Sequence, residues 1–380
     1  MNIAYISNSF IPSRTANSIH VMKMCQAFSN NGHDVTLFVP DAREELEQGV
    51  VDIFDYYDVE HNFVLQKVRW PNIKGNSYIF GFLAAKAAAQ QKPDIVYCRH
   101  LAGCYFSTLQ GQKVIFEVHS PIANASKLSK FRELLFKKLI NSNKLQGIVV
   151  ITHSLKKYYE KHYPQLKGKI IVAPDGADAV SVDMQVKSLE TRHERLQVGY
   201  VGHLYKGKGM EVLSQLAPLC PWADFHVVGG AKEDILFWQQ HCESIVNLYF
   251  HGYVPHKEAV KFINTFDVVL LPNQRVVHPH GTENSNIGEW TSPLKLFEYM
   301  SNGKAILASR LPVLGEILTD GVNGLLCDPE DVSEWMNALM RLNGDQMLAK
   351  RLSKQAFDDF NQKYTWKIRA KSLVGSVEKC

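Results

Sequence analysis

Short apolar runs alternate with helix-like segments along almost the whole chain, and this alternation constrains the fold more than any other feature. Strands that are buried on both faces of a parallel sheet read as nearly continuous Val, Ile and Leu runs. When such runs alternate with helical patterns, they predict an α/β fold with a parallel sheet. The strands predicted in this way are residues 3–6, 34–39, 95–97, 113–118, 147–151, 197–201, 224–228, 248–250, 268–271 and 305–308.

The predicted strands form two series, separated by the polar segment 183–194, which is typical of a linker. We therefore predict two doubly wound, Rossmann-like domains facing one another across a cleft. The first comprises residues 1–183 and the second residues 184–363. A helix within residues 364–380 is expected to pack back on the first domain. Open parallel sheets bind ligands at the carboxyl ends of their strands, so functional residues are sought there.

The composition excludes several classes of protein. A net charge of +4 over 380 residues is too small for a concentrated nucleic-acid-binding face. The seven cysteines include no CxxC pair, which predicts neither a zinc site nor a disulfide framework. The N-terminal residues already read as a buried strand, and no apolar run approaches the ~20 residues of a membrane span. We predict a cytoplasmic protein.

The segment 291–303 carries marks of a short helix with a ligand at its start. Ser292 is a favoured N-cap residue, Pro293 suits the first helical position and Gly303 suits the position after the helix. The free N–H groups and the dipole at such a helix start favour a phosphate. Glu298 lies roughly 7–8 Å farther along, at ~1.5 Å per residue, which is about the span from a pyrophosphate to the attached ribose.

The sequence TSPLKLFEYMSNGKAILAS at 291–309 resembles the donor-binding helix of the family-4 retaining glycosyltransferases (glycosyl transferases group 1), in the subgroup with an SPLKLFEYM helix. These enzymes have the two-domain GT-B fold. In that family the pattern is Glu, seven residues, Glu. Trp290 occupies the position of the first glutamate, with Glu289 one residue earlier. The donor-binding residues implied for this segment are Thr291, Ser292, Pro293, Leu294, Lys295 and Glu298.

A glycine-rich loop follows the predicted strand 197–201. Its pattern Gly202-x4-Gly207-Lys208 nearly matches a phosphate-binding P-loop. However, Gly209 stands where a P-loop needs Ser or Thr to hold magnesium, and no second acidic magnesium ligand is evident. A P-loop nucleotidase is therefore disfavoured.

The same loop resembles the Val-Gly-Arg-Leu-x3-Lys-Gly segment of the glycosyltransferase family. Lys208 matches the lysine that holds the donor diphosphate, and a cation there would stabilise the charge that develops on the leaving group. His203 replaces the family arginine. The resemblance implies donor binding at His203, and the lost positive charge would be supplied by Arg275 or Lys295.

Other strand ends carry further candidates. His119 follows the predicted strand 113–118, and the resemblance implies that this histidine contacts the donor sugar as part of the catalytic site. A histidine beside an apolar run is also common as a purely structural residue. Further donor contacts are implied at Asn17, Asp175, Gly229, Tyr253 and Val254.

No metal or other cofactor is expected, because the nucleotide-sugar is a substrate. No Asp-x-Asp motif is present, and His278-x-His280, in the loop 272–290, lacks a third ligand at suitable spacing. The basic segment 127–144 repeats Leu and Phe at helical spacing. Such a helix either has a solvated basic face or contacts an anionic membrane surface peripherally.

Together these features predict a retaining glycosyltransferase. It would transfer a sugar from a nucleoside diphosphate donor, with UDP-glucose as the default, to a glycan or lipid-linked acceptor in polysaccharide or glycoconjugate synthesis. A nucleotide-sugar epimerase of the same fold and a catalytically silent sugar-nucleotide-binding subunit remain alternatives. An NAD-dependent dehydrogenase is disfavoured, because the first predicted strand–helix turn, residues 7–13, contains no glycine.

Overall fold

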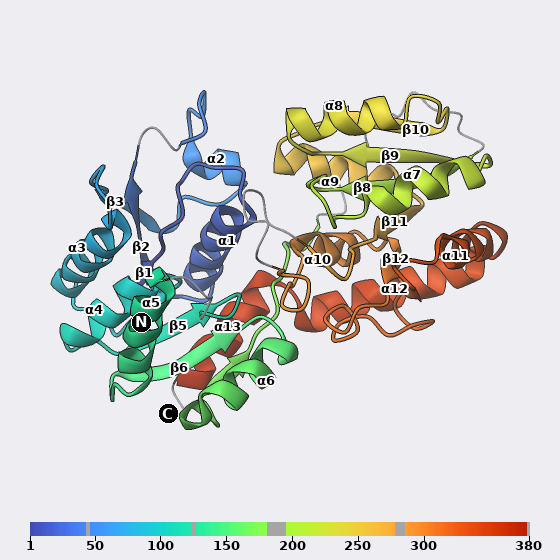
Figure 1. Ribbon diagram of the computed structural model, residues 1–380. Coiled ribbons are helices and arrows are strands. Elements are labelled where there is room, and N and C mark those ends of the chain that lie inside the picture. The colour runs from blue at the N-terminus through green and yellow to red at the C-terminus, as the bar shows by residue number, and fades with distance from the viewer. Residues whose placement is uncertain (43–45, 123–126, 181–194, 278–285, 378–380) are drawn as a thin grey trace. The chain divides into compact units, whose positions relative to one another are not determined.

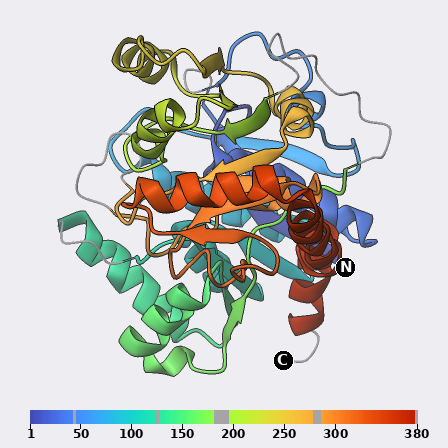
Figure 2. The same cartoon turned by 90° about the vertical axis from the view of Figure 1, so that its right-hand side faces the viewer.

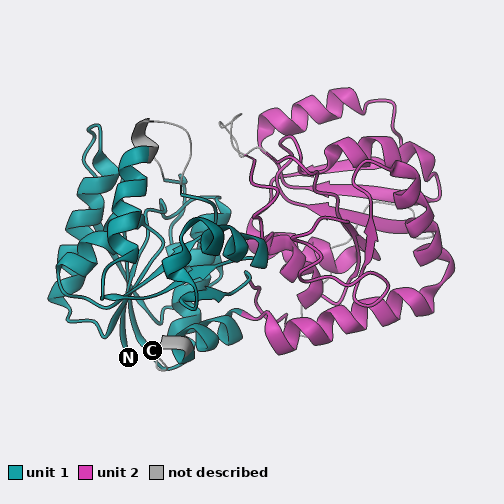
Figure 3. Cartoon of the chain, turned by 60° about the horizontal axis from the view of Figure 1, so that its bottom comes forward, with its two compact units in different colours: residues 1–175, 366–380 teal, residues 176–365 magenta. Residues whose placement is uncertain are grey.

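The computed structural model describes residues 1–42, 46–122, 127–180, 195–277 and 286–377 (Figure 1). The chain divides into two compact units (Figure 3). Unit 1 comprises residues 1–175 and 366–380, and unit 2 comprises residues 176–365. The expected boundary at 183/184 is therefore eight residues late, because Asp175 is buried within unit 1 and Ala177 already pairs with Thr365 of unit 2. The predicted linker, residues 183–194, lies outside the described residues.

Unit 1 contains a seven-stranded parallel sheet in the order β3-β2-β1-β4-β5-β6-β7. Its strands are β1 (Asn2–Ile6), β2 (Asp34–Asp41), β3 (Val64–Arg69), β4 (Ile95–Cys98), β5 (Val114–Val118), β6 (Leu145–Val150) and β7 (Ile170–Val172). Its helices are α1 (Ala16–Asn30), α2 (Ile53–Tyr57), α3 (Asn76–Gln90), α4 (Leu101–Leu109), α5 (Lys127–Ile140), α6 (His153–His162), the short 3-10 helix η2 (Pro164–Leu166) and the C-terminal α13 (Trp366–Val377).

The strand order of this sheet reverses between β1 and β4. Right-handed crossovers then place α1 and α2 on one face and α3 to α6 on the other. The C-terminal helix α13 packs beside α1, while α4 packs against both α3 and α5. The point of reversal is where open α/β sheets bind ligands, and in unit 1 it lies at the ends of β1 and β4.

Unit 2 contains a six-stranded parallel sheet in the order β10-β9-β8-β11-β12-β13. Its strands are β8 (Leu196–Val201), β9 (Ala223–Val228), β10 (Leu248–Gly252), β11 (Val268–Leu271), β12 (Ala305–Ser309) and β13 (Leu325–Cys327). Its helices are α7 (Met210–Leu219), α8 (Lys232–His241), α9 (His256–Thr265), α10 (Leu294–Ser301), α11 (Val332–Gly344) and α12 (Gln346–Lys363). The order reverses between β8 and β11. Helix α12 packs against α10 and β12, and Figure 2 gives a second view of these elements.

The α/β fold and the ten predicted strands are confirmed, whereas β3, β7 and β13 were not predicted. Strand β3 is an edge strand with exposed side chains, and β7 and β13 have three residues each, so none gives a clear apolar run. The basic helix α5 ends at Ile140 rather than continuing to residue 144. Within the described residues, no helix has both the length and the apolar character needed to cross a bilayer.

Candidate functional site

The glycine-rich loop of unit 2 lies at the reversal point between β8 and β11. Gly202 has φ 146° and Gly207 has φ 88°, conformations that favour glycine. A Cβ atom on Gly207 would lie 2.2 Å from the carbonyl oxygen of Val276, in the segment after β11. The glycines therefore allow the loop after β8 to lie directly against the chain that follows β11.

Lys295, from the first turn of α10, reaches this loop. Its ammonium lies 3.9 Å from the centroid of the Tyr200 ring, within the range of a cation–π contact. A Cβ on Gly202 would approach the Lys295 Nζ to 2.8 Å, so the missing side chain makes room for the ammonium. The Nζ atom is buried and has no hydrogen-bond partner among the described residues. Burial, together with the nearby charge of Lys208, holds the pKa of Lys295 well below its usual range.

Lys208 is the second cation of the site. Its side chain is 9% exposed and its ammonium lies 5.2 Å from the centroid of the Tyr205 ring. Burial lowers the pKa of Lys208 to about 8. In the part of the chain that the structure describes, neither Lys208 nor Lys295 is in ion-pair contact with a carboxylate. Glu298 attracts the Lys295 ammonium but makes no ion-pair contact with it, and the pKa of Lys295 stays well below its usual range. Two neighbouring buried cations without an ion-pair contact are costly, so this arrangement favours an anionic ligand.

Helix α10 begins one residue later than predicted. Pro293 is the N-cap, with ψ 122° and no side-chain capping bond, and Leu294 is the first helical residue. The prediction of a Ser292 cap with Pro293 at N1 is wrong, because Pro293 is in an extended conformation. The end of the helix is as predicted, since Gly303 follows it with φ 59°. The first N–H groups of α10 have no partner within the helix, which makes its start suitable for an anion.

Glu298 lies about one turn beyond this helix start. Its Oε1 lies 2.8 Å from Nε2 of His256, at the start of α9, and its side chain is 16% exposed. Its distance from Leu294 along the helix is roughly 6 Å at ~1.5 Å per residue. A carboxylate held in this way can accept hydrogen bonds from a pair of vicinal hydroxyl groups.

Comparison with known proteins agrees with this geometry. Residues 18–180 match the model of Glycosyltransferase Family 4, and residues 182–359 match that of Glycosyl transferases group 1. The chain is a glycosyltransferase of family 4, group 1. It is 23% identical to an uncharacterized glycosyltransferase of Methanocaldococcus jannaschii, over 86% of this chain and 77% of that protein.

Solved structures support the GT-B fold of this glycosyltransferase. The sucrose-phosphate synthase of Thermosynechococcus elongatus superposes with a TM-score of 0.74 at 17% identity, covering 100% of this chain and 98% of that one. Anabaena HepE, solved in complex with UDP and glucose, has a TM-score of 0.72 at 13% identity, covering 100% and 99%. At these identities the likeness establishes the fold alone.

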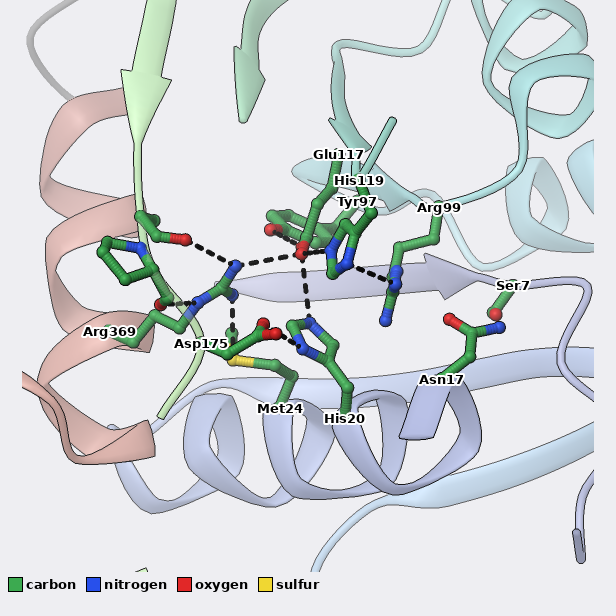
Figure 4. A network of polar contacts seen from close by, with 12 residues as sticks. Ser7, Asn17, His20, Met24, Tyr97, Arg99, Glu117, His119, Asp175 and Arg369 are labelled. Carbon is green, nitrogen blue, oxygen red and sulfur yellow. Dashed lines mark hydrogen bonds and ion pairs between the residues drawn. The ribbon is translucent and has the colours of Figure 1, made fainter. Parts of the chain in front are cut away.

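In unit 1 of the glycosyltransferase, polar side chains converge on the buried Glu117 of β5 (Figure 4). Its carboxylate accepts a hydrogen bond from the Tyr97 hydroxyl, and its Oε1 contacts His119 Nε2 at 2.6 Å, Arg369 NH2 at 2.9 Å and His20 Nε2 at 3.1 Å. Burial alone would raise the pKa of Glu117, but Arg369 and the histidines hold it well below its usual range. The carboxylate is therefore ionised and anchors the network.

His119, the predicted catalytic histidine, lies at the end of β5 with both ring nitrogens occupied. Its Nδ1 lies 3.0 Å from NH2 of Arg99, which can only donate. The ring therefore accepts at Nδ1 and donates from Nε2 to Glu117. Burial, followed by the charge of Arg99, lowers the pKa of His119 to about 4, so the ring is neutral near neutral pH. Its contact with the donor sugar stays a prediction.

Asp175 was predicted to bind the donor, and the structure places its carboxylate within the network of unit 1. Its side chain is 5% exposed and its Oδ1 lies 2.8 Å from Nδ1 of His20. Burial raises the pKa of Asp175, but His20 outweighs burial and keeps the pKa below its usual value. Asn17, on α1, donates from its amide to Ser9 Oγ at 2.6 Å. Donor binding by Asn17 and by Asp175 stays a prediction.

The network also has the geometry of a possible metal group. Ligand atoms of His20, Glu117, His119 and Asp175 all lie within 4.8 Å of one another. A divalent cation would have to share Glu117 with the Arg369 guanidinium, only 2.9 Å from the same oxygen. The positive charge already present does not suit a further dication. The four residues fit a network satisfied by arginine better than a metal site.

The structure places the remaining predicted residues at several positions in unit 2. Arg275 is exposed and contacts Asp328 at 3.0 Å, whereas the Lys295 ammonium lies against Gly202 at the start of the glycine-rich loop. His203 is exposed, and its carbonyl accepts from the Tyr200 hydroxyl at 2.6 Å. The other placements are Gly229 against the backbone of Gly202, Tyr253 exposed after β10, Val254 against the core, Thr291 and Ser292 half-buried before α10, Trp290 half-buried and Glu289 exposed. His278 and His280 lie outside the described residues.

Reasoning from the sequence missed five residues of the unit 1 network: His20, Tyr97, Arg99, Glu117 and Arg369. Glu117 gave a signal, because an acid in the middle of an apolar strand must find a partner. Arg369 gave none, since it is 252 residues away and reaches Glu117 only because α13 packs back on unit 1.

Proposed function

We propose that this glycosyltransferase transfers a sugar from a UDP-sugar, with UDP-glucose as the default, to a glycan or lipid-linked acceptor. The single observation that carries the donor assignment is a pair of buried cations beside the start of α10, Lys208 and Lys295, neither of which is in ion-pair contact with a carboxylate among the described residues. A pyrophosphate would supply the missing negative charge. Structural neighbours solved with UDP or UDP-glucose support the choice of nucleotide.

In this proposal the diphosphate binds Lys208, Lys295 and the free N–H groups of Leu294 and Lys295 at the start of α10. Ser292 completes the diphosphate site from the preceding segment. Glu298 accepts hydrogen bonds from the ribose hydroxyls, with His256 holding the carboxylate in place. The distance of roughly 6 Å along the helix, at ~1.5 Å per residue, suits the separation of these two parts of the nucleotide.

The reaction is proposed to retain the anomeric configuration and to need no metal. The acceptor hydroxyl attacks the anomeric carbon on the face from which the diphosphate departs, and its proton passes to a leaving phosphate oxygen. The carbon–oxygen bond to the diphosphate breaks, and its electrons remain on UDP. Lys208 and Lys295 stabilise the charge that develops there, which is the role that a bound cation would otherwise have. Unit 1 binds the acceptor.

The test of the donor site is calorimetry with two ligands, UDP and inorganic pyrophosphate. Glu298→Ala should weaken UDP binding by about tenfold or more, as expected for lost hydrogen bonds to a charged group. Pyrophosphate has no ribose, so its affinity should be unchanged in that variant. Lys295→Met should weaken the binding of both ligands. Equal loss of both ligands in Glu298→Ala, or normal UDP binding in Lys295→Met, would contradict the assignment.

We further propose that unit 1 contacts an anionic membrane surface through α3 and α5. Phe131 and Leu134 of α5 are 48% and 49% exposed, and Phe82 of α3 is 44% exposed. The Phe131 ring packs against Tyr78 of α3, so the exposed apolar side chains of the two helices adjoin. Exposed lysines flank them on α5. Apolar side chains bordered by lysine are the pattern of an interfacial helix, and this surface would bring unit 1 to a lipid-linked acceptor.

A further inference from the structure

Arg99 is a guanidinium at the ligand-binding edge of unit 1 that the proposed mechanism does not use. It directly follows β4, and its backbone N–H donates to the carbonyl of Ile6 at the end of β1, at 3.0 Å. Ile6 and Cys98 are register partners, so Ser7 and Arg99 are adjacent at the carboxyl ends of the two strands. This is the point where the strand order of the unit 1 sheet reverses.

The contacts of Arg99 leave part of its guanidinium unmatched. NH2 donates to His119 Nδ1, which fixes the position of the side chain. NH1 is buried and has no hydrogen-bond partner within the described ranges. A buried donor without a partner costs free energy, and the cost is larger for a charged group.

The charge of Arg99 is also without a counter-ion. The two carboxylates of the neighbouring network are directed elsewhere: Glu117 contacts His119, His20 and Arg369, and Asp175 contacts His20 (Figure 4). Among the residues that the structure describes, Arg99 is in ion-pair contact with no acid. His119 is neutral and cannot balance it. An arginine that is held in place through one nitrogen and has an unpaired N–H group on the other is suited to a planar or tetrahedral oxyanion.

From this geometry we infer that Arg99 binds an acidic group, phosphate or carboxylate, on the acceptor substrate. The inference rests on the proposed function, in which the donor diphosphate is bound by lysines of unit 2 and the acceptor by unit 1. It narrows the acceptor class to a sugar or glycan that carries an acidic substituent near the reacting hydroxyl.

Four probes test this inference by calorimetry: glucose 6-phosphate, glucuronate, neutral glucose and inorganic phosphate. We expect the protein to bind one of the two acidic sugars more tightly than glucose, and the preferred one identifies the group as phosphate or carboxylate. Arg99→Gln should weaken that binding by about tenfold or more, which is about the value of one charge-assisted hydrogen bond. Arg99→Lys retains the charge but lacks the planar guanidinium. Its affinity for the acidic sugar should lie between the affinities of the unchanged protein and Arg99→Gln.

Arg69→Gln is the matched control, because Arg69 is an exposed arginine at the end of β3 on the same edge of the sheet. It should bind the acidic sugar as the unchanged protein does. Arg99→Gln should bind UDP normally, which also shows that the variant is folded.

Four results would overturn the inference. The first is equal affinity of the unchanged protein and Arg99→Gln for the acidic sugar, and the second is no binding of either acidic sugar. The third is inorganic phosphate that binds at least as tightly as glucose 6-phosphate. The fourth is a loss of UDP affinity in Arg99→Gln. The last result would assign Arg99 to the donor. Failure of the unchanged protein to bind UDP would instead count against the proposed function. The binding of acidic sugars would still test Arg99 independently.

Discussion

Replacing Lys208 with methionine should stabilise the unliganded protein while removing its affinity for UDP. The pKa of this lysine falls from the ordinary 10.5 to about 8 because the side chain is buried. At about 1.4 kcal/mol per pKa unit, this shift means that the charged form costs about 3 kcal/mol at neutral pH. Methionine keeps the apolar stem but loses the contact with the Tyr205 ring, about 0.5–2 kcal/mol. We expect a net stabilisation of about 1–2 kcal/mol.

The dependence of stability on pH has a defined sign. The pKa of Lys208 is lower in the folded protein than in the unfolded chain, so the unfolded state binds the proton more tightly. The contribution of Lys208 to the free energy of unfolding should therefore be most favourable above pH 10.5. It should fall as the pH drops from 10.5 to about 8 and then stay constant at lower pH. Lys208→Met should lack this part of the pH dependence.

The assay is urea unfolding with and without saturating UDP, together with calorimetry of UDP binding. At a ligand concentration of about 100 times Kd, UDP should stabilise the unchanged protein by about 2.7 kcal/mol, and it should not stabilise Lys208→Met. Lys206→Met is the matched control, because Lys206 is exposed in the same loop and its removal should change neither property.

Lys304 provides a second comparison. Burial also lowers the pKa of Lys304 to about 8, but its ammonium donates to the carbonyls of Asn264 and Phe266 at 2.8 and 3.0 Å. Lys304→Met should therefore destabilise the protein, because two buried carbonyls lose their donor. If Lys208→Met were also destabilised, or bound UDP normally, the reasoning that Lys208 is a cation held ready for an anion would be refuted.

Three other outcomes are expected. UDP affinity should weaken as the pH rises above about 8, because Lys208 must then take up a proton on binding, and calorimetry in buffers of different ionisation enthalpy should detect that proton. Arg369→Met should destabilise unit 1 by about 3–5 kcal/mol in urea unfolding, because it leaves Glu117 charged and buried, and adding Glu117→Gln should recover part of the loss. Replacing Phe131 and Leu134 with serine should reduce sedimentation with phosphatidylserine-containing vesicles at unchanged UDP affinity, and unchanged sedimentation would rule out that surface.

The sequence allowed the α/β class and most strands to be predicted, because buried parallel strands leave long apolar runs such as 268–271. Lys208 and Lys295, both predicted to bind the donor from motifs beside strand or helix ends, lie near one another in unit 2. The start of α10 was predicted less well. Pro293 can occupy either an N-cap or the first helical position, and only its ψ angle distinguishes the two.

The unit 1 network could not be predicted from local sequence. Its residues come from α1, from β4 and β5 and the residues that directly follow them, from the segment after β7, and from α13. No sequence spacing relates Arg369 to His20. His119 was found because it ends an apolar strand, but the assignment of its two nitrogens required the positions of Glu117 and Arg99. Asp175 was interpreted as a donor ligand from a short turn motif, which cannot reveal that its carboxylate faces a buried histidine.

The buried carboxylates of the unit 1 network are in ion-pair contact with Arg369 or His20, whereas the two buried lysines of the proposed donor site in unit 2 are not in such contact with a carboxylate among the described residues. In unit 1 the central Glu117 is matched by Arg369 and His20, so that region is stable without a ligand and holds His119 in one tautomer. In unit 2, neither Lys208 nor Lys295 is in ion-pair contact with a carboxylate among the described residues. An acid placed near them would lower the cost of the free state, but it would also compete with a diphosphate for the same ammonium groups. In the proposed donor site, the absence of a carboxylate in ion-pair contact with either lysine within the described residues would therefore have a functional reason: it would make the free protein less stable and leave both ammonium groups available to the donor diphosphate.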